Sequence, residues 1–366
     1  MKIALTGGGT AGHITPNLAL IPELKKRGYE IIYIGSKNGM EKDIMKSHNI
    51  PFFGITCDKL RRYIDPKNLL MPMNVIFGIR EAEKILKENK IDIIFSKGGF
   101  VAVPVVLAAS KLKIPVISHE ADFTPGLANK IAIPISKVIC TNFKETAKQI
   151  GKKGVHTGCP IRPELLNGNA EKGRNFLKFN NDKPILTITG GSLGSLYINN
   201  LVRNNLNRLL PFVNIAHMCG KGKVVDPEKL TNINNDYVKD GYRQYELIKD
   251  ELPDVLAASR LVVSRAGANI LFELLALNKL NLIIPLSLKA SRGDQILNAK
   301  SFAKQGFSVV LFEEEQNKNE NLFFEKLMEI KERKNELLEN MKKANENNAI
   351  TKICDIIDEN LKATIK

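Results

Sequence analysis

The 366-residue sequence has no tryptophan, and only 6% of its residues are aromatic. Its five cysteines are odd in number and form no C-x-x-C pair: Cys57, Cys140, Cys159, Cys219 and Cys354. This pattern argues against a disulfide framework or a zinc site and favours a reducing compartment. No stretch approaches the roughly 20 apolar residues of a membrane-spanning helix. We expect a cytoplasmic protein, since the first residues also run into a glycine loop before a signal-peptide core can form.

The positive charge of the chain, net +15, is concentrated in its first half. Residues 1–162 carry 25 Lys and Arg against 13 Asp and Glu, a net +12, whereas residues 163–366 carry 29 against 26, a net +3. This asymmetry indicates a surface that meets anions, of which nucleic acid and anionic membranes are the usual ones. A general lysine bias of the genome would give a similar excess. The few aromatics and the lack of a stacking motif argue against nucleic acid.

Apolar strands alternate with helical stretches in two successive blocks, which predicts an α/β fold with two Rossmann-like, doubly wound parallel-sheet domains. The expected strands of the first block cover residues 2–6, 30–34, 91–95, 115–118 and 137–141, with a helix over residues 16–27. Those of the second block cover residues 184–189, 214–218, 242–248, 261–264, 281–285 and 308–312. We expect an N-terminal domain over residues 1–161, a C-terminal domain over residues 162–348, and a last helix over residues 349–366 that crosses back to the first. Ligands bind at the carboxyl ends of parallel strands, so loops of both domains should line one cleft.

A glycine loop, Gly7–Gly12 (GGGTAG), follows the first expected strand and fits the G-x-G-x-x-G pattern of dinucleotide sites. Such a site needs an acidic residue about 20 residues further on, whereas the next strand here ends Ile34-Gly35-Ser36. The dinucleotide hypothesis is therefore the weaker one. The loop offers backbone N–H groups and a helix N-terminus to an anion. His13 directly follows the loop, and its imidazole can act as a general base. A histidine at a helix start can also have no functional role.

Seven segments of the chain carry a more specific signal: GGGTAGHITPNLAL, KGGFVAVPVVLAA, SHEADFTPGLANK, TGCPIRPEL, ITGGSLGSLYIN, VVSRAGANILFELLAL and SRGDQILNAKSF. In this order they resemble the MurG family, the GlcNAc transferases that convert lipid I to lipid II in peptidoglycan synthesis. The resemblance runs over nearly the whole chain. It implies the two-domain GT-B fold, with the acceptor on the first domain and UDP-GlcNAc mainly on the second.

The resemblance also implies site residues. His13 matches the proposed catalytic histidine, and the residues expected to bind UDP-GlcNAc are Thr10, Ala11, Gly12, Arg162, Ser192, Ile248, Ala268, Asn269, Glu273, Gln295 and Asn298. Glu273 is the expected ribose carboxylate and Gln295 the expected sugar ligand, and an amide suits hydroxyl groups because it both donates and accepts. Taken alone, Glu273 can be an ordinary helix residue and Gln295 an ordinary surface residue. The backbone that contacts uracil falls at Ile248 or Lys249.

Two departures from the family pattern bear on the site. Ala11 stands where relatives often have glycine, and Asp122 in the segment His119-Glu120-Ala121-Asp122 replaces an amide. Asp122 is therefore a second candidate for the general base. No D-x-D triplet, the usual carboxylate pair for a divalent ion on a nucleotide sugar, occurs in the sequence.

The reaction implied by the resemblance is an inverting transfer without metal or other cofactor, in which the C4 hydroxyl of MurNAc attacks the anomeric carbon of GlcNAc. Another UDP-GlcNAc enzyme of the same fold, such as an epimerase, is the alternative. The implied location is the cytoplasmic face of the inner membrane, where the protein is peripheral and meets lipid I. Residues 59–87 favour an anionic membrane surface, because they combine basic and apolar side chains: Arg61, Arg62, Lys67, Leu69, Leu70, Met71, Met73, Ile76 and Phe77. A core helix with a solvated flank would show a similar pattern.

Overall fold

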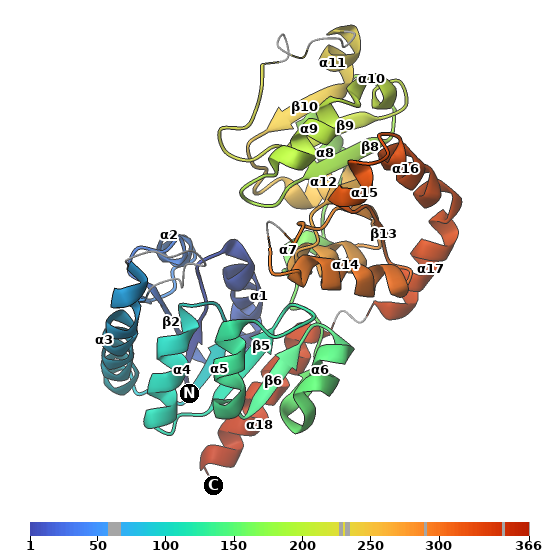
Figure 1. The fold of residues 1–366 in the computed structure, drawn as a ribbon. Helices are drawn as coiled ribbons and strands as arrows, with labels where there is room; N and C mark the ends of the chain where they lie inside the picture. The colour runs from blue at the N-terminus through green and yellow to red at the C-terminus, as the bar shows by residue number, and fades with distance from the viewer. Residues whose placement is uncertain (58–66, 227–229, 231–234, 289–290, 346–347, 366) are drawn as a thin grey trace. The chain divides into compact units, whose positions relative to one another are not determined.

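The computed structural model describes residues 1–57, 67–226, 230, 235–288, 291–345 and 348–365. The chain divides into two compact units (Figure 1). The first comprises Met1–Arg162 together with Glu346–Lys366, and the second comprises Pro163–Asn345. Both units are parallel α/β structures, as the alternation of strands and helices predicts.

The first unit is built on a seven-stranded parallel sheet with the order β3-β2-β1-β4-β5-β6-β7. Its strands are β1 (Lys2–Thr6), β2 (Glu30–Ser36), β3 (Phe52–Ile55), β4 (Ile93–Ser96), β5 (Val116–Glu120), β6 (Val138–Thr141) and β7 (Gly154–His156). The central strands are apolar along their length because helices cover both faces of the sheet. The strand order reverses between β1 and β4, and this switch point is where ligands bind in sheets of this kind.

Helices α1, α2 and α18 share one apolar core with the first sheet, and α3, α4 and α5 share the core on the other face. The helices of this unit are α1 (Ala11–Lys26), α2 (Glu41–Ser47), α3 (Lys67–Glu88), α4 (Ala102–Lys111), α5 (Leu127–Ile135), α6 (Lys144–Ile150), the 3-10 turn η1 (Gly151–Lys153) and α18 (Ala349–Ile365).

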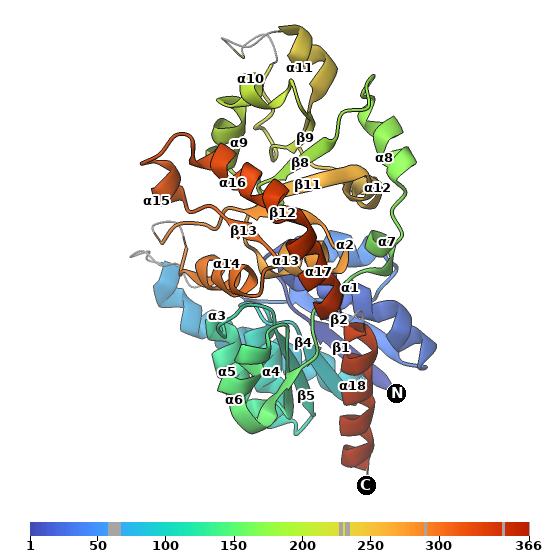
Figure 2. The ribbon, with the colours of Figure 1, turned by 90° about the vertical axis from the view of Figure 1, so that its right-hand side faces the viewer.

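Helix α18 packs against α1 although some 320 residues separate them in the sequence (Figure 2). Its residues Ile353, Ile357 and Leu361 are buried in the core beneath α1. Asp358 accepts hydrogen bonds from Arg27 Nη1 at 2.8 Å and from the Tyr29 hydroxyl at 2.6 Å. The last helix is thus an integral part of the first unit.

The prediction that the first helix begins at Pro16 was wrong, because α1 begins at Ala11. Thr10 is still extended, with φ −150° and ψ 154°, and the helix starts directly behind it. Pro16 and Pro22 both lie inside this helix, where each leaves the carbonyl four residues earlier without its usual N–H donor. His13 therefore lies in the first helical turn.

The second unit contains a six-stranded parallel sheet with the order β10-β9-β8-β11-β12-β13, and its switch point lies between β8 and β11. Its strands are β8 (Ile185–Thr189), β9 (Asn214–Met218), β10 (Tyr242–Tyr245), β11 (Ser259–Ser264), β12 (Leu280–Ile283) and β13 (Val309–Val310). Its helices are α7 (Pro163–Leu166), α8 (Ala170–Leu177), α9 (Leu196–Arg203), α10 (Leu206–Leu209), α11 (Asn235–Gly241), α12 (Leu252–Ala258), α13 (Ala268–Ala276), α14 (Asp294–Lys304), α15 (Glu313–Gln316), α16 (Leu322–Glu332) and α17 (Lys334–Ala344).

Candidate functional site

Two glycine segments meet at the switch point of the first unit. The loop after β1 holds Gly9 with φ +82°, and a side chain there would clash with the Phe100 ring. The loop after β4 holds Gly99 with φ +80°, where an added Cβ would lie 2.7 Å from the Gly8 carbonyl oxygen and 3.0 Å from His13 Cδ2. Glycine is needed at these two positions because each combines a left-handed backbone with a close neighbour.

The base of the first loop is held by buried polar side chains. The Tyr33 hydroxyl donates to the Gly7 carbonyl at 2.7 Å, and Asn17 Nδ2 donates to that hydroxyl and to the Thr6 carbonyl at 3.2 Å each. At the other end of the loop, Thr10 precedes α1 but makes no side-chain capping bond, and the first turn of α1 has no acidic residue. The N-terminus of α1 is therefore suited to an anion.

The ring of His13 lies beside the glycine segment after β4, and its Nδ1 atom is enclosed without a hydrogen-bond partner in the described part of the chain. Burial and, to a lesser extent, the charge of Lys97 lower the pKa of His13 to about 4, while the Lys97 carbonyl opposes the shift. The ring is therefore neutral at physiological pH and able to accept a proton, which is the state a general base needs.

Lys97 is the first residue after β4, and only 1% of its surface is exposed. Its Nζ atom has no hydrogen-bond partner among the residues that the structure describes. Burial lowers the pKa of this ammonium group, whereas the Cys159, Glu120 and Asp122 side chains raise it. Sequence reasoning missed Lys97, although it stands at the head of the quoted segment KGGFVAVPVVLAA.

Asp122 lies in the loop after β5, and the buried Glu120 organises that loop. Glu120 Oε1 accepts from the Asp122 backbone N–H at 2.9 Å, and Oε2 accepts from Gly126 N at 2.9 Å and Asn129 Nδ2 at 2.8 Å. Burial and the Asp122 charge raise the pKa of Glu120, and these hydrogen bonds oppose the shift. In the sheet, β4 lies between β1 and β5. His13 follows β1, Lys97 follows β4 and Asp122 follows β5, so the three residues come after three neighbouring strands.

The switch point of the second unit carries the other glycine loop, residues 190–194. Ser192 is exposed in it. Ser195 caps α9 by accepting from Ile198 N at 3.3 Å. Lys223 Nζ donates to the carbonyls of Leu193 at 2.6 Å and Gly194 at 3.3 Å, which holds the loop against the segment after β9. In the part of the chain that the structure describes, the loop is thus held by bonds other than those of the Ser192 side chain.

Arg265, the first residue after β11, joins several strand ends of this sheet. It donates through Nη2 to Ser195 Oγ at 2.7 Å and through Nη1 to the carbonyls of Ile284 at 3.1 Å and Pro285 at 3.2 Å. It also pairs with Glu313 Oε1 at 2.5 Å. Sequence reasoning missed this buried arginine too, since nothing in a single strand–loop segment shows which distant carbonyls will surround it.

Helix α13 begins directly behind this arginine with Gly267 as its N-cap, without a side-chain cap and without an acidic residue in its first turn. Ala268 is buried at the first helical position, and Asn269 and Glu273 are half-buried. The helix therefore presents backbone N–H groups to an anion, and Glu273 follows one turn later.

The amides of Gln295 and Asn298 on α14 reach back to two strand–helix loops. Gln295 Oε1 accepts from Leu286 N at 3.1 Å, and Asn298 Nδ2 donates to the Ala266 carbonyl at 3.2 Å. Asn298 is fully buried, which indicates that it positions the loop before α13, whereas Gln295 is half-buried. Ile248 is buried in the loop between β10 and α12. The structure places these residues after different strands of one sheet, all at its carboxyl edge.

The remaining predicted residues belong to the first unit. Ala11 and Gly12 are in the first turn of α1, and Thr10 and Gly12 are exposed. Arg162 is the last residue of that unit, half-buried, with an Nε atom that lacks a hydrogen-bond partner among the described residues. In the same described ranges, no three His, Cys, Asp or Glu side chains lie together as a metal site would require. No helix within them is long and apolar enough to cross a membrane.

Two parallel α/β units, each with a glycine loop and a helix start without a side-chain cap at its switch point, are typical of glycosyltransferases that use nucleotide sugars, and the family models match that class. The model of the glycosyltransferase family 28 N-terminal domain matches residues 3–141, and that of the family 28 C-terminal domain matches residues 185–357. A Clostridium perfringens protein is 54% identical over 97% of both chains, and a Clostridium tetani protein is 54% identical over 98% of both. Both are named UDP-N-acetylglucosamine–N-acetylmuramyl-(pentapeptide) pyrophosphoryl-undecaprenol N-acetylglucosamine transferase.

Solved structures agree with this assignment. The crystal structure of Acinetobacter baumannii MurG matches with a TM-score of 0.74 at 25% identity, covering 98% of this chain and 99% of that one. The chain belongs to the MurG family of glycosyltransferases. A UDP-GlcNAc 2-epimerase from Neisseria meningitidis also matches, with a TM-score of 0.67, 98% of this chain and all of that one covered, but at 15% identity it shares the fold alone. The predicted fold and family are therefore confirmed, and the epimerase alternative is not favoured.

Proposed function

We propose that this chain transfers N-acetylglucosamine from UDP-GlcNAc to the C4 hydroxyl of MurNAc in undecaprenyl-pyrophosphoryl-MurNAc-pentapeptide, converting lipid I to lipid II. The observation that carries this proposal is the 54% identity, over almost the whole chain, with transferases named for that reaction. The uncapped N-termini of α1 and α13 support it, because both substrates of the reaction carry a diphosphate.

The donor is held by the second unit. The UDP diphosphate lies at the N-terminus of α13 near Ala268 and Asn269, and the exposed Ser192 hydroxyl donates to it. Glu273 accepts hydrogen bonds from the ribose hydroxyls, and backbone at Ile248 or Lys249 contacts uracil. Gln295 binds the GlcNAc hydroxyls through its amide nitrogen, since its oxygen already accepts from Leu286 N. Arg162 and the exposed Thr10 and Gly12 add contacts from the first unit.

In the reaction, the C4 hydroxyl oxygen of MurNAc forms a bond to the anomeric carbon of GlcNAc. The bond from that carbon to the β-phosphate oxygen breaks, so the anomeric configuration inverts and UDP leaves. The neutral His13 ring takes the proton of the attacking hydroxyl. Asp122 is the second candidate for this role, because it follows the strand on the other side of β4. The negative charge on departing UDP is stabilised by the N–H groups of α13 and requires no metal ion in this scheme.

A radiolabelled UDP-GlcNAc assay with and without lipid I tests the function. We expect label to enter the lipid fraction only when lipid I is present, with UDP released in equal amount. Conversion of UDP-GlcNAc without acceptor would instead identify an epimerase-type activity. Release of free GlcNAc alone would point to a hydrolase and would contradict the proposed transfer.

Replacing His13 by alanine tests the proton acceptor. We expect UDP-GlcNAc to bind as in the wild type while turnover at saturating acceptor falls about 100-fold or more, as for loss of a general base. His48→Ala is the matched control, because His48 is exposed at the end of α2 in the same unit. Wild-type turnover in His13→Ala, with Asp122→Asn inactive, would assign the proton to Asp122.

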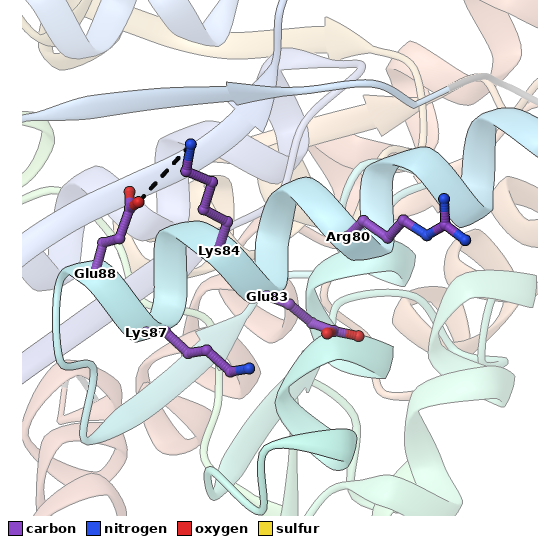
Figure 3. A pocket seen from close by; sticks show the side chains of 5 residues that line it. All are labelled: Arg80, Glu83, Lys84, Lys87 and Glu88. Atoms are coloured by element: carbon purple, nitrogen blue, oxygen red, sulfur yellow. Dashed lines mark ion pairs between the residues drawn. The ribbon is translucent and has the colours of Figure 1, made fainter.

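We also place the membrane-binding surface on α3, which would make the protein peripheral at the cytoplasmic face. Met73, Ile76 and Phe77 are 54%, 50% and 46% exposed, and together they form an apolar stripe. Arg80, Lys84 and Lys87 continue this stripe at helical spacing, and Figure 3 shows them on the second half of α3. Apolar and cationic side chains on one helix face suit an anionic lipid surface.

The charges on this half of α3 border a surface hollow of about 380 Å³ lined by Arg80, Glu83, Lys84, Lys87 and Glu88. Glu83 pairs with Lys111 at 2.7 Å, and Lys84 lies 3.8 Å from Glu88 (Figure 3). Arg80 and Lys87 are exposed, and the ion pairs that the lining residues of this hollow form in the described chain are those of Glu83 and Lys84. The predicted patch also contained Arg61 and Arg62, which lie outside the described residues.

Vesicle sedimentation tests this surface. We expect salt-sensitive binding to anionic vesicles and weak binding to neutral ones, and a loss of binding in Phe77→Ser with Arg80→Ser. Phe212→Ser with Arg208→Ser is the matched control, because Phe212 is the most exposed phenylalanine of the second unit and Arg208 is a nearby cation. Equal binding to anionic and neutral vesicles would contradict the proposed attraction between the basic side chains of α3 and anionic lipid.

A further inference from the structure

Two backbone segments pack against each other at the carboxyl edge of the second sheet. Residues 190–194 follow β8 and contain the exposed Ser192, and residues 219–223 follow β9, the neighbouring strand. The two backbones are in direct contact, because a side chain at Gly194 would clash with the Cys219 carbonyl. The position of residues 219–223 therefore limits where the loop that carries Ser192 can lie.

The side chain of Lys223 joins the two segments. Its Nζ atom donates to the carbonyls of Leu193 at 2.6 Å and Gly194 at 3.3 Å, and the side chain is half-buried. Hydrogen bonds from a charged donor are stronger than those between neutral groups. Lys223 therefore fixes the direction of two successive carbonyls in the loop.

Two side chains of α9 anchor the backbone of the segment that carries Lys223. The fully buried Asn199 donates through Nδ2 to the Cys219 carbonyl at 2.9 Å, and Arg203 Nη2 donates to the Lys223 carbonyl at 2.7 Å. Arg203 Nη2 also donates to Gln244 Oε1 on β10 at 3.0 Å. Because both ends of the segment are tied in this way, Lys223 is a fixed point to which the loop is attached.

The direction of the two carbonyls decides which partial charge the loop offers to a ligand. A carbonyl oxygen that faced a phosphate would repel it, whereas backbone N–H groups attract it. The N–H and C=O groups of a trans peptide point in opposite directions. When the Gly194 carbonyl faces Lys223, the Ser195 N–H therefore faces away from Lys223, at the start of α9. The contact holds two carbonyl oxygens on the Lys223 side and leaves the other side of the loop to N–H groups.

We propose that Lys223 is a positioning residue of the donor site: its ammonium group holds the carbonyls of Leu193 and Gly194, so that the loop presents N–H groups and the Ser192 hydroxyl to a diphosphate. Lys223 acts through the loop and touches no substrate. The identity of the ligand, UDP-GlcNAc, rests on the proposed function. The effect of Lys223 on the loop of the unliganded protein does not rest on it and is measured separately.

Hydrogen exchange of the Gly194 amide in the unliganded protein is the first measurement. This N–H donates to the Gly191 carbonyl at 2.9 Å and closes the turn that contains Ser192. In Lys223→Met, which removes the ammonium group and keeps the chain length, we expect exchange about 10-fold faster or more, as for loss of hydrogen bonds to a charged group. Lys223→Arg should restore slow exchange, because a guanidinium group can donate to both carbonyls.

NMR titration with UDP and with uridine is the second measurement. We expect Lys223→Met to bind UDP about 10-fold more weakly and uridine, which has no phosphate, as the wild type does. Lys223→Arg should recover most of the UDP affinity. KM for UDP-GlcNAc should rise by a similar factor in Lys223→Met with little change in kcat, because the loop binds the diphosphate before and during the reaction.

Lys279→Met is the matched control. Lys279 Nζ also donates to two carbonyls of the second unit, those of Ala257 at 3.0 Å and Ser259 at 2.8 Å, but Ser259 begins β11 at the opposite edge of the sheet. This variant should leave the exchange of Gly194 and the affinity for UDP unchanged.

Unchanged Gly194 exchange in folded Lys223→Met overturns the proposal even when UDP binds more weakly, because the ammonium group would then act on phosphate directly. Faster exchange with unchanged UDP affinity, or an equal loss of uridine binding, overturns it as well. If Lys223→Met does not fold, Lys223→Gln takes its place, and if neither folds, Lys223 stabilises the whole unit and the proposal is overturned. A wild type that binds UDP but transfers no GlcNAc to lipid I contradicts the proposed function, whereas faster exchange and weaker UDP binding in Lys223→Met would still support the role of Lys223.

Discussion

Replacing Arg265 by methionine removes a cation that joins the ends of β8, β11 and β12. The change deletes the pair with Glu313 at 2.5 Å, the bond to Ser195 at 2.7 Å and two bonds to strand-end carbonyls. The Arg265 and Glu313 side chains are only 8% and 15% exposed, so the carboxylate is left without its partner in a poorly solvated place. Removing one member of such a pair costs about 3–5 kcal/mol. We expect a loss of that size in the second unit.

The matched control is Arg333→Met, which deletes the pairs with Glu329 and Glu336 on the surface, where Arg333 is 35% exposed. Exposed pairs contribute about 0–1 kcal/mol, so this variant should unfold almost as the wild type does. The double variant Arg265→Met with Glu313→Leu should recover much of the loss, because no buried charge is then left unpaired.

Urea unfolding, with amide hydrogen exchange of β11 and β12 to report on the second unit alone, measures all three variants. The local readout is needed because two units do not unfold as one two-state system. A loss below about 1 kcal/mol in Arg265→Met, or a double variant no more stable than the single one, would refute the reasoning. It would show that the guanidinium contacts do not hold the strand ends together.

Three further predictions concern the loop beside His13, the donor site and the stability of the protein at low pH. Gly99→Ala puts a methyl group against the Gly8 carbonyl and the His13 ring at a position with φ +80°. We expect kcat to fall roughly 10-fold or more, because the ring is displaced. An unchanged kcat would mean that turnover does not depend on the position of the His13 ring. Glu273→Gln should raise KM for UDP-GlcNAc about 10-fold with little change in kcat, and a wild-type KM would remove Glu273 from the donor site. Burial and the Arg203 charge lower the pKa of His217 to about 3, below the unfolded value of 6.5, so the free energy of unfolding should fall as pH drops from 6.5 towards 3. A flat urea-midpoint profile between pH 7 and 4 would contradict this.

Local sequence patterns predicted most of the strands, because a parallel strand that is covered on both faces consists almost entirely of apolar residues. Strand β3, Phe52–Ile55, was not predicted, since its short run is interrupted by Gly54 and its residues are largely half-buried. The helix start at Ala11 was missed because Pro16 resembles a first-turn proline. The helix start depends on the backbone conformation of Thr10, which the sequence alone does not predict.

The candidate site was predictable where residues stand in a glycine loop or match the family, as His13, Ser192 and Glu273 do. Lys97 and Arg265 were not, because burial of a charged side chain depends on groups brought together from several strands, as around Arg265. Each cation is ordinary in its own segment and becomes unusual only when its neighbours are in place.

Because helix α18 belongs to the first unit, the ribosome completes the chain of the second unit before that of the first. The residues that close the first core, among them Ile353 and Ile357, are translated only after the whole of Pro163–Asn345. The second unit can finish folding on the ribosome while the core that α1 and α2 share with the first sheet still lacks the apolar side chains of α18. Until Arg27 and Tyr29 meet Asp358, the half of the molecule made first is the half that needs protection from aggregation.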